Sequence, residues 1–259
     1  MYEVNLIQLH QWLGQFVWPL FRISAFFMTL PIFGTHLVPA RIRVALAVLI
    51  CFLLQPFLPQ LPSVDLSASS VGLVFQQVII GLAMGFLLQI VFHVFVLAGQ
   101  IISMQMGLGF ASMNDPANGV SATVLSQFYL MLAMLLFLNA GGHLIAIRAL
   151  VESFTAIPVG GALLFNAESA WYLVSIASWM FGCALLISLP AVTALLVVNI
   201  AFGVMTRAAP QLNIFSLGFP MTLLFGLVVV WAGLSDFQSQ FADVMSQGFV
   251  HLRQLLVVP

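Results

Sequence analysis

Between Asp65 and Asp115 the chain carries no Asp, Glu, Lys or Arg, and this gap restricts its fold more than any other feature. The apolar segment inside it, from about 71 to 106, would be on the order of 54 Å long as a helix, against a bilayer hydrocarbon core of roughly 30 Å. In the whole chain, 5% of residues are charged and 63% are hydrophobic. Soluble domains carry roughly 25% charged residues, so this chain lacks the polar surface needed to stay dissolved in water. We therefore expect an all-α protein of a membrane or membrane complex.

Apolar segments alternate with breaks along the chain, which predicts about six long segments. Besides 71–106, they are expected at about 6–32, 44–54, 120–154, 170–205 and 215–234. Two consecutive glycines in Asn139–His143 predict a bend or re-entrant break in the fourth segment, and Pro190 predicts a kink in the fifth. In 236–259, apolar and polar side chains recur at helical spacing, which predicts an amphipathic C-terminal helix.

We expect these segments to form a single integrated unit of kinked helical hairpins in four sections. The first, 1–62, is an N-terminal apolar hairpin that ends in a proline-containing linker. The second, 63–119, supplies the long helix and the loop after it. The third, 120–206, supplies helical hairpins, and the fourth, 207–259, supplies the last apolar helix and the amphipathic tail.

The long helix is expected to fray near Gly107 and Gly109, because glycine adopts backbone conformations that other residues avoid. Asp115-Pro116 and Asn118-Gly119 then favour a turn, which leaves a short apolar loop between helix and turn. Two interpretations stay open on the residues alone. The loop is either a helix C-cap and connector buried against neighbouring helices, or a movable apolar constriction that closes a conducting path by excluding water.

One line along the long helix carries small and polar residues on an otherwise apolar surface. At about 100° per residue, the members of this stripe fall within about 40° of one line. They are Gly85, Gln89, His93, Gln100, Ser103 and Gly107. Gly81 and Gly85 also form a small pair four residues apart, which lets another helix approach closely. The stripe serves helix packing with amide hydrogen bonds, or lines a wet path, and the two roles are compatible.

Charged residues inside the apolar segments carry further expectations. An arginine at the bilayer centre costs at least roughly 2.5–3.5 kcal/mol, so Arg22 should face protein, water or a partner carboxylate. Arg148 and Glu152 stand four residues apart and are expected to pair. Apart from Glu152, the long apolar runs contain no acidic residue, which argues against a proton-coupled carrier.

No catalytic constellation is recognisable in the sequence. It has no HExxH zinc pattern, no GxSxG elbow and no glycine-rich loop with a lysine for phosphate. Cys51 and Cys183 lie in apolar runs, as small buried side chains do. A net charge of −1 leaves no basic patch for nucleic acid. The histidines without metal-ligand spacing are His10, His36, His93, His143 and His251. We therefore expect no catalytic residue, metal, cofactor or nucleic-acid partner, and no enzymatic activity.

A recognisable block runs from Arg207 to Pro220 and includes Pro210, Asn213 and Gly218. It resembles the signature of the flagellar biosynthetic protein FliR family, whose injectisome counterparts serve type III secretion. Gly107-Leu108-Gly109-Phe110-Ala111 with Asp115-Pro116 resembles the plug loop of that family, and Pro39-Ala40-Arg41-Ile42-Arg43 resembles its early arginine-containing block. The resemblance extends over nearly the whole chain in the order and spacing of segments.

The resemblance implies a subunit of the flagellar type III protein export gate. FliR-like proteins join FliP and FliQ in a closed helical assembly, and with FlhB and FlhA form the gate for unfolded flagellar export substrates. The implied location is the flagellar basal body in the bacterial inner membrane, with the assembly raised toward the periplasm. Such packing against partner subunits would explain segments that are longer than a bilayer span.

The resemblance also assigns roles to the loop, and it favours the constriction over the simple connector. Phe110 is expected to be the main obstructing side chain, and Gly107 and Gly109 are expected to act as hinges. The supporting apolar side chains are Leu108, Met104, Met106 and Met113. Methionine suits this role because its flexible side chain repacks around varied sequences.

The block near the end of the fifth segment has an expectation from elementary physics as well. Arg207 either caps the C-terminus of that helix, where a cation complements the helix dipole, or contacts a partner subunit. Pro210, Gly218 and Pro220 are expected to redirect the chain into the sixth segment.

Two other classes of function remain as alternatives. A small-molecule permease would carry a solute as a purified chain in vesicles, whereas a gate subunit would be inactive without its partners. A purely structural scaffold would tolerate substitutions in the loop without a change in ion leak or export.

Overall fold

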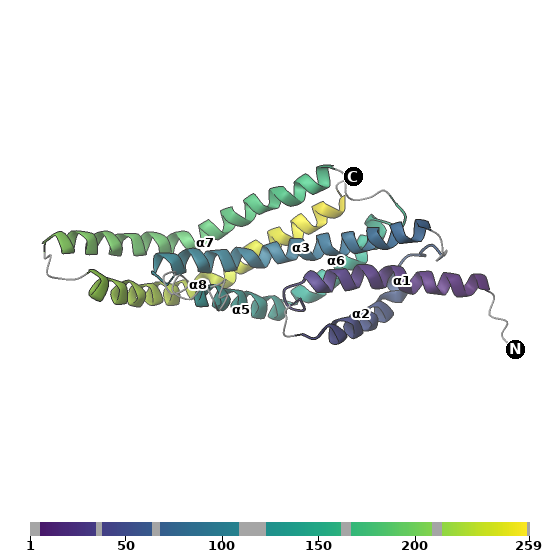
Figure 1. Cartoon of the computed structure of the whole chain (residues 1–259), viewed down its shortest axis with the longest axis horizontal. Coiled ribbons are helices and arrows are strands. Elements are labelled where there is room, and N and C mark those ends of the chain that lie inside the picture. The colour runs from purple at the N-terminus through teal and green to yellow at the C-terminus, as the bar shows by residue number, and fades with distance from the viewer. Residues whose placement is uncertain are drawn as a thin grey trace. The chain divides into compact units, whose positions relative to one another are not determined.

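The computed structural model describes residues 6–34, 38–63, 68–108, 123–161, 167–208 and 214–257. These residues are almost entirely helical and contain no strand, which confirms the expected all-α class (Figure 1). The helices are α1 (Leu6–Thr29), α2 (Ala40–Leu54), α3 (Ala68–Gln105), α5 (Val124–Asn139), α6 (Gly142–Ala156), α7 (Ala167–Ala208) and α8 (Ile214–Val257). A short 3-10 helix, η1 (Gln55–Phe57), follows α2 in the expected linker.

Four helices in the described residues contain an apolar stretch long enough to cross a membrane. These stretches are Ala40–Phe57, Ser70–Gln105, Ala170–Ala208 and Gly218–Leu256. α5 and α6 would add a fifth as a broken span, because they are bent by 72° at the turn between them. The bend confirms the expectation for the double glycine. Gly141 has φ +69°, in the left-handed region that only glycine adopts without strain, and it precedes the first residue of α6.

The chain divides into two compact units. Unit 1 comprises 1–90, 140–176 and 247–259, and unit 2 comprises 91–139 and 177–246. α3, α7 and α8 each contribute one part to each unit. The sections expected from the sequence remain a prediction, and the units are described separately below.

Unit 1 is built around a close contact between α1 and the first part of α3. A Cβ atom added at Gly81 would collide with the Arg22 carbonyl, and one added at Gly85 would collide with Thr29. This confirms that the two glycines allow another helix to approach closely. Beside this contact, Trp18, Leu61, Phe154 and Val159 form a buried cluster, and Trp18 Nε1 donates to the Pro62 carbonyl at 3.0 Å. The linker after α2 is therefore fixed against α1.

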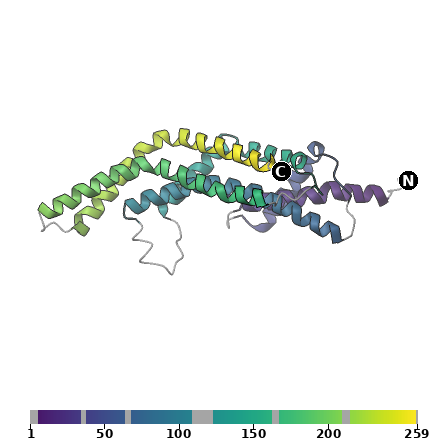
Figure 2. The same cartoon turned by 90° about the horizontal axis from the view of Figure 1, so that it is seen from above.

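Unit 2 contains the second part of α3, α5, and most of the α7–α8 hairpin, whose helices run side by side in both views (Figures 1 and 2). Aromatic rings join three of these helices. Phe95 of α3 lies 5.4 Å from Phe237 and 5.7 Å from Phe241 of α8, and Tyr129 of α5 lies 5.3 Å from Phe237, measured between ring centroids. The core of unit 2 thus contains a cluster of aromatic side chains from α3, α5 and α8.

α8 differs from the expectation of two separate C-terminal elements. The sixth apolar segment and the amphipathic tail form one 44-residue helix. The apolar face expected in the tail is nonetheless confirmed, since Phe237, Phe241, Val244, Met245 and Leu252 are all buried. The polar side chains after Leu234 did not end the helix, because serine, glutamine and aspartate on an exposed face leave its apolar face intact. One consequence is a correction: Asp236 and Asp243 lie within an apolar span, which the sequence was expected to keep free of acids.

Candidate functional site

The C-terminal end of α3 is closed by a complete Schellman motif. The Leu108 N–H donates to the Ser103 carbonyl and the Gly107 N–H donates to the Met104 carbonyl, both at 3.0 Å. Gly107 has φ +82°, the left-handed conformation that this motif requires. The helix therefore ends in an ordered cap rather than by fraying, and the C-cap interpretation is confirmed for the residues up to Leu108.

The side chains around this cap differ sharply in exposure. Met106 is 1% exposed and packs over Gly226 of α8, where an added Cβ would come within 2.5–2.8 Å of three Met106 atoms. Met104 is 66% exposed, and Leu108 is half-buried. Met106 thus anchors the end of α3 to α8 within unit 2, while Met104 stays accessible.

Three of the predicted loop residues, Gly109, Phe110 and Met113, lie outside the described residues. Their roles as hinge and obstructing side chains remain proposals. The same holds for Pro210 and Asn213 in the block after α7. Within that block, Arg207 is exposed in the last turn of α7, Gly218 is buried in α8, and Pro220 is exposed in α8.

The stripe predicted along α3 does not share one environment. Gly85 packs against Thr29 in unit 1, Gln89 and Gln100 are half-buried, and His93 is exposed. Ser103 is fully buried, and its Oγ has no hydrogen-bond partner among the described residues. Within the stripe, Gly85 lies in the close contact between α1 and α3.

Arg22 is the most buried charge in unit 1, at 0% exposure. Its Nε donates to Gln77 Oε1 at 2.8 Å, its Nη1 to the Ser153 carbonyl and Oγ at 2.8 and 3.0 Å, and its Nη2 to the Ile157 carbonyl at 3.0 Å. Its guanidinium carbon lies 4.1 Å from the centre of the Phe154 ring. Arg22 therefore faces protein, as expected, and no carboxylate is among its contacts. Its charge is instead placed beside the carbonyls of Ser153 and Ile157 at the C-terminal end of α6, where the helix dipole is negative.

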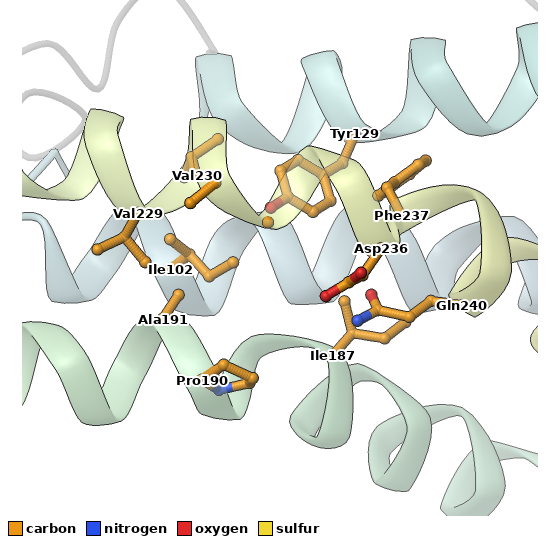
Figure 3. A pocket seen from close by; sticks show the side chains of 12 residues that line it. Ile102, Tyr129, Ile187, Pro190, Ala191, Val229, Val230, Asp236, Phe237 and Gln240 are labelled. Carbon is orange, nitrogen blue, oxygen red and sulfur yellow. The ribbon is translucent and has the colours of Figure 1, made fainter.

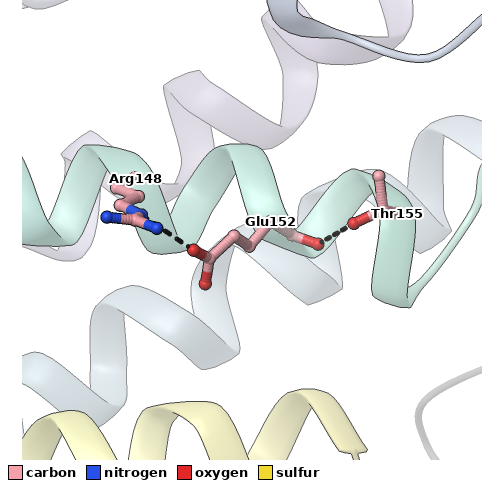
Figure 4. A network of polar contacts seen from close by, with 3 residues as sticks. All are labelled: Arg148, Glu152 and Thr155. Carbon is pink, nitrogen blue, oxygen red and sulfur yellow. Dashed lines mark hydrogen bonds and ion pairs between the residues drawn. The ribbon is translucent and has the colours of Figure 1, made fainter.

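Arg148 and Glu152 pair on the exposed surface of α6, as expected. Nε of Arg148 lies 3.0 Å from Oε1 of Glu152, and Thr155 Oγ1 donates to the Glu152 carbonyl at 2.8 Å (Figure 4). The two side chains are 78% and 42% exposed, so solvent screens this pair almost completely.

Unit 2 contains a pocket of about 280 Å³ beside the proline in α7. Its polar side chains are Tyr129 of α5 and Asp236 and Gln240 of α8. In Figure 3, Asp236 and Gln240 lie next to each other with their polar ends toward Ile187 of α7, and Tyr129 extends from α5 past α8. The remaining lining residues are Ile102, Ile187, Pro190, Ala191, Val229, Val230, Ala232, Gly233 and Phe237.

The polar side chains of this pocket are a carboxylate, an amide and a phenol, and the other side chains that line it are apolar. Such a lining can accept hydrogen bonds and a positive charge. No cluster of three or more His, Cys, Asp or Glu side chains occurs within the described ranges.

Sequence reasoning missed this pocket. Asp236 and Gln240 stand four residues apart and so share a helix face, which is a signal that the sequence does contain. The sequence analysis instead assigned both residues to a separate amphipathic tail. Tyr129 and Pro190 gave no signal of their own, because their approach depends on how α5 and α7 pack within unit 2.

Comparisons with known proteins identify the family. Residues 13–248 match the family described as "Bacterial export proteins, family 1". The chain is 40% identical over 232 residues to the flagellar biosynthetic protein FliR of Escherichia coli K12, a match that covers 90% of this chain and 88% of that protein. It is 36% identical over 230 residues to FliR of Pectobacterium carotovorum, covering 89% and 88%, and 33% identical over 231 residues to FliR of Buchnera aphidicola from Acyrthosiphon pisum, covering 89% of each. Together with its apolar helices, these matches show that the chain is a membrane-embedded protein of the FliR family of flagellar export components.

Proposed function

We propose that this chain is a gate subunit of the flagellar type III export apparatus, in a channel formed with FliP and FliQ and together with FlhB and FlhA. Unfolded flagellar substrates would pass through this channel in the bacterial inner membrane, with the assembly raised toward the periplasm. The main observation in support of this proposal is that the chain belongs to the FliR family over nearly its whole length. The names of these relatives, flagellar biosynthetic proteins, favour this function over a small-molecule permease.

The surfaces of the long helices support assembly with other subunits. In the most apolar 18-residue stretch of α7 and in that of α8, 22% of the residues are buried, against 67% in the corresponding stretch of α3. α7 alone exposes Trp171, Phe181 and Leu186 at 73%, 54% and 72%. Apolar patches of this size mark surfaces that contact protein partners or lipid. Because each span is 39 residues, on the order of 58 Å as a helix, lipid alone cannot cover it.

The loop after α3 is proposed to obstruct the channel at rest. Phe110 would be the main blocking side chain, aided by Leu108, Met104 and Met113, with Gly107 and Gly109 as hinges. The Schellman motif supports this arrangement, because it gives the apolar residues that follow a fixed point of departure. Met106, also expected in the obstruction, is buried against Gly226, so its role is to anchor that point.

Deleting 107–112 tests the proposed obstruction. In cells that make the complete apparatus, the deletion should raise ion leak, because an apolar constriction that excludes water would be missing. Ion conductance can be measured by the swelling of cells in solutions of permeant ions. Unchanged leak in a fully assembled apparatus would contradict a sealing role.

Gly109→Val tests the proposed hinge, because a β-branched residue restricts the backbone conformations that glycine allows. Export of flagellar subunits into the medium should fall while the assembly stays intact. Gly72→Val is the matched control, since an added Cβ at this exposed glycine of α3 meets nothing within 4 Å. Normal export by the Gly109 variant would remove the hinge from the proposal.

A solute-transport assay with the purified chain alone in vesicles distinguishes the proposed gate subunit from the permease alternative. The proposal expects no solute transport under these conditions, since the channel requires other subunits. Transport of a solute by the isolated chain would favour the permease.

A further inference from the structure

The pocket in unit 2 contains polar atoms that the described residues leave without partners. Tyr129 is 6% exposed, and its hydroxyl makes no hydrogen bond to any described residue. The side chains of Asp236 and Gln240 line the same pocket and likewise have no hydrogen-bond partner in the described part of the chain. A buried phenol that faces an open pocket costs free energy unless an incoming group accepts or donates a hydrogen bond there. The pocket therefore offers hydrogen-bonding groups to a polar ligand.

Asp236 indicates that the occupant of the pocket carries a positive charge. This carboxylate is the single ionisable acid that lines the pocket, and it lies within the apolar span Gly218–Leu256 of α8. The chain has no lysine, and Arg207 is the one arginine in the described part of unit 2. Arg207 lies 17 residues after Pro190 on α7, on the order of 25 Å along the helix. Asp236 is exposed and forms no ion pair with a described residue, so within this apolar span it is open to a cation from outside the chain.

The walls of the pocket indicate what carries this cation. Ala191, Ala232 and Gly233 line it, and a Cβ added at Gly233 would meet nothing within 4 Å. Small residues at an open surface let the backbone of another helix approach closely. Around them, Leu189 is 53% exposed and Val228 59% exposed, so the occupant must also cover apolar surface. A hydrated ion would not cover that surface, and a lipid acyl chain would not satisfy the carboxylate.

The size of the pocket fits one side chain. Its volume of about 280 Å³ lies just below the range of roughly 300–1,000 Å³ that is usual for small-molecule sites. The head group of a lysine or arginine needs acceptors, and the carboxylate of Asp236 and the amide oxygen of Gln240 provide them side by side (Figure 3).

We infer that this pocket receives the ammonium or guanidinium group of a lysine or arginine carried by an apolar helix of a neighbouring subunit. Asp236 accepts the charge, Gln240 and Tyr129 complete its hydrogen bonds, and the small residues on α7 and α8 admit the helix that bears it. This inference rests on the proposed assembly with other subunits and names the chemistry of one contact within it.

A photo-crosslinker in the pocket tests the inference. Val229 lines the pocket and is half-buried, so p-benzoylphenylalanine in its place should react with whatever occupies it. The full chain is produced in cells with the complete apparatus, irradiated, purified, and its adducts identified by mass spectrometry. The expected adduct is an apolar peptide of another subunit with a lysine or arginine within about one helical turn, 3.6 residues, of the attachment point.

Substitutions then show whether the charge directs the contact. Asp236→Asn should lower the yield of this adduct roughly tenfold, the size expected from loss of a charge-assisted hydrogen bond. Asp243→Asn is the matched control, because Asp243 is exposed on the same helix, as Asp236 is, but does not line the pocket; it should leave the yield unchanged. Tyr129→Phe keeps the ring packed on Phe237 and removes only the hydroxyl, so a smaller loss is expected.

The outcomes separate this inference from the proposed function. If the unmodified chain did not co-purify with other apparatus subunits, the proposed assembly would fail and the inference with it. If co-purification were normal but the adducts were lipid alone, or peptides without lysine or arginine, only the inference would be overturned. Equal adduct yields from the Asp236 and Asp243 variants would also overturn it. Exchange of charges between Asp236 and the identified basic residue should restore the adduct.

Discussion

Arg22 in unit 1 and Asp236 in unit 2 are both charged side chains in apolar helices, but their surroundings are opposite. Arg22 is completely buried and donates to Gln77, Ser153 and the Ile157 carbonyl. Asp236 lines an open pocket and has no partner in the described residues. A charge within an apolar helix is thus an internal joint in one unit and, by our inference, an outward binding position in the other.

Arg22→Met gives the largest expected effect on this comparison. It removes the charge but keeps an apolar side chain, and it leaves Gln77 Oε1 and the Ile157 carbonyl without the donors that Arg22 supplies. We expect a loss of about 3–5 kcal/mol in the free energy of unfolding, as when one member of a buried polar network is removed. Denaturant titration of the purified chain in mild detergent measures it. A loss below about 1 kcal/mol would mean that Arg22 is not an internal joint, since exposed sites behave in that way.

Gly81→Ala tests the close helix contact beside that joint. The new methyl group would collide with the Arg22 carbonyl, which is backbone and cannot move aside, so a loss of about 1–3 kcal/mol is expected. Gly72→Ala on the same helix is the control. Its Cβ meets nothing within 4 Å, so alanine should be neutral or stabilise the helix by up to about 1 kcal/mol. The same denaturant titration compares the two, and equal values would show that α1 and α3 are not in close contact.

Arg148→Ala sharpens the comparison by removing a charge that is neither buried nor in a pocket. The pair with Glu152 is exposed and stands four residues apart on α6, so its loss should cost only about 0.3–0.5 kcal/mol. Added salt should reduce that difference further, because exposed ion pairs are screened. A salt-independent loss of several times this size would reveal a contact beyond Glu152.

Asp236→Asn should have the smallest effect on the isolated chain. Because the carboxylate has no internal partner, we expect the free energy of unfolding to change by less than about 0.5 kcal/mol, or to rise slightly as a charge leaves an apolar surface. The isolated chain in detergent is the relevant sample, since partners are absent. A large loss would show that Asp236, like Arg22, serves its own subunit, and the contrast between the two charges would disappear.

Much of the fold follows from local sequence signals. The small pair Gly81 and Gly85, the break at Asn139–His143 and the kink residue Pro190 act through backbone geometry within a few residues, so their positions are readable from the chain. The partners of Arg22 are not readable in this way. Ser153 and Ile157 lie 131 and 135 residues away, and only the packing of α1 against α6 brings them together.

The candidate site was less predictable than the fold. The end of α3 at Gly107 was expected, but its ordered Schellman motif and the burial of Met106 were not, because the latter depends on Gly226 in a distant helix. The pocket was hidden by the assumption that α8 ends near Leu234. A helix ends where its backbone donors and acceptors find other partners, and polar side chains on one face do not provide such an end.

The long bare faces of α7 and α8 have a consequence for how the cell handles this chain. A copy made in excess of its companions would leave exposed the large apolar side chains that these two helices carry on their surfaces, among them Trp171, Leu186 and Trp231. Such orphans should be recognised by membrane quality-control proteases, so the cellular amount of the protein would follow the supply of its assembly companions rather than its own rate of synthesis.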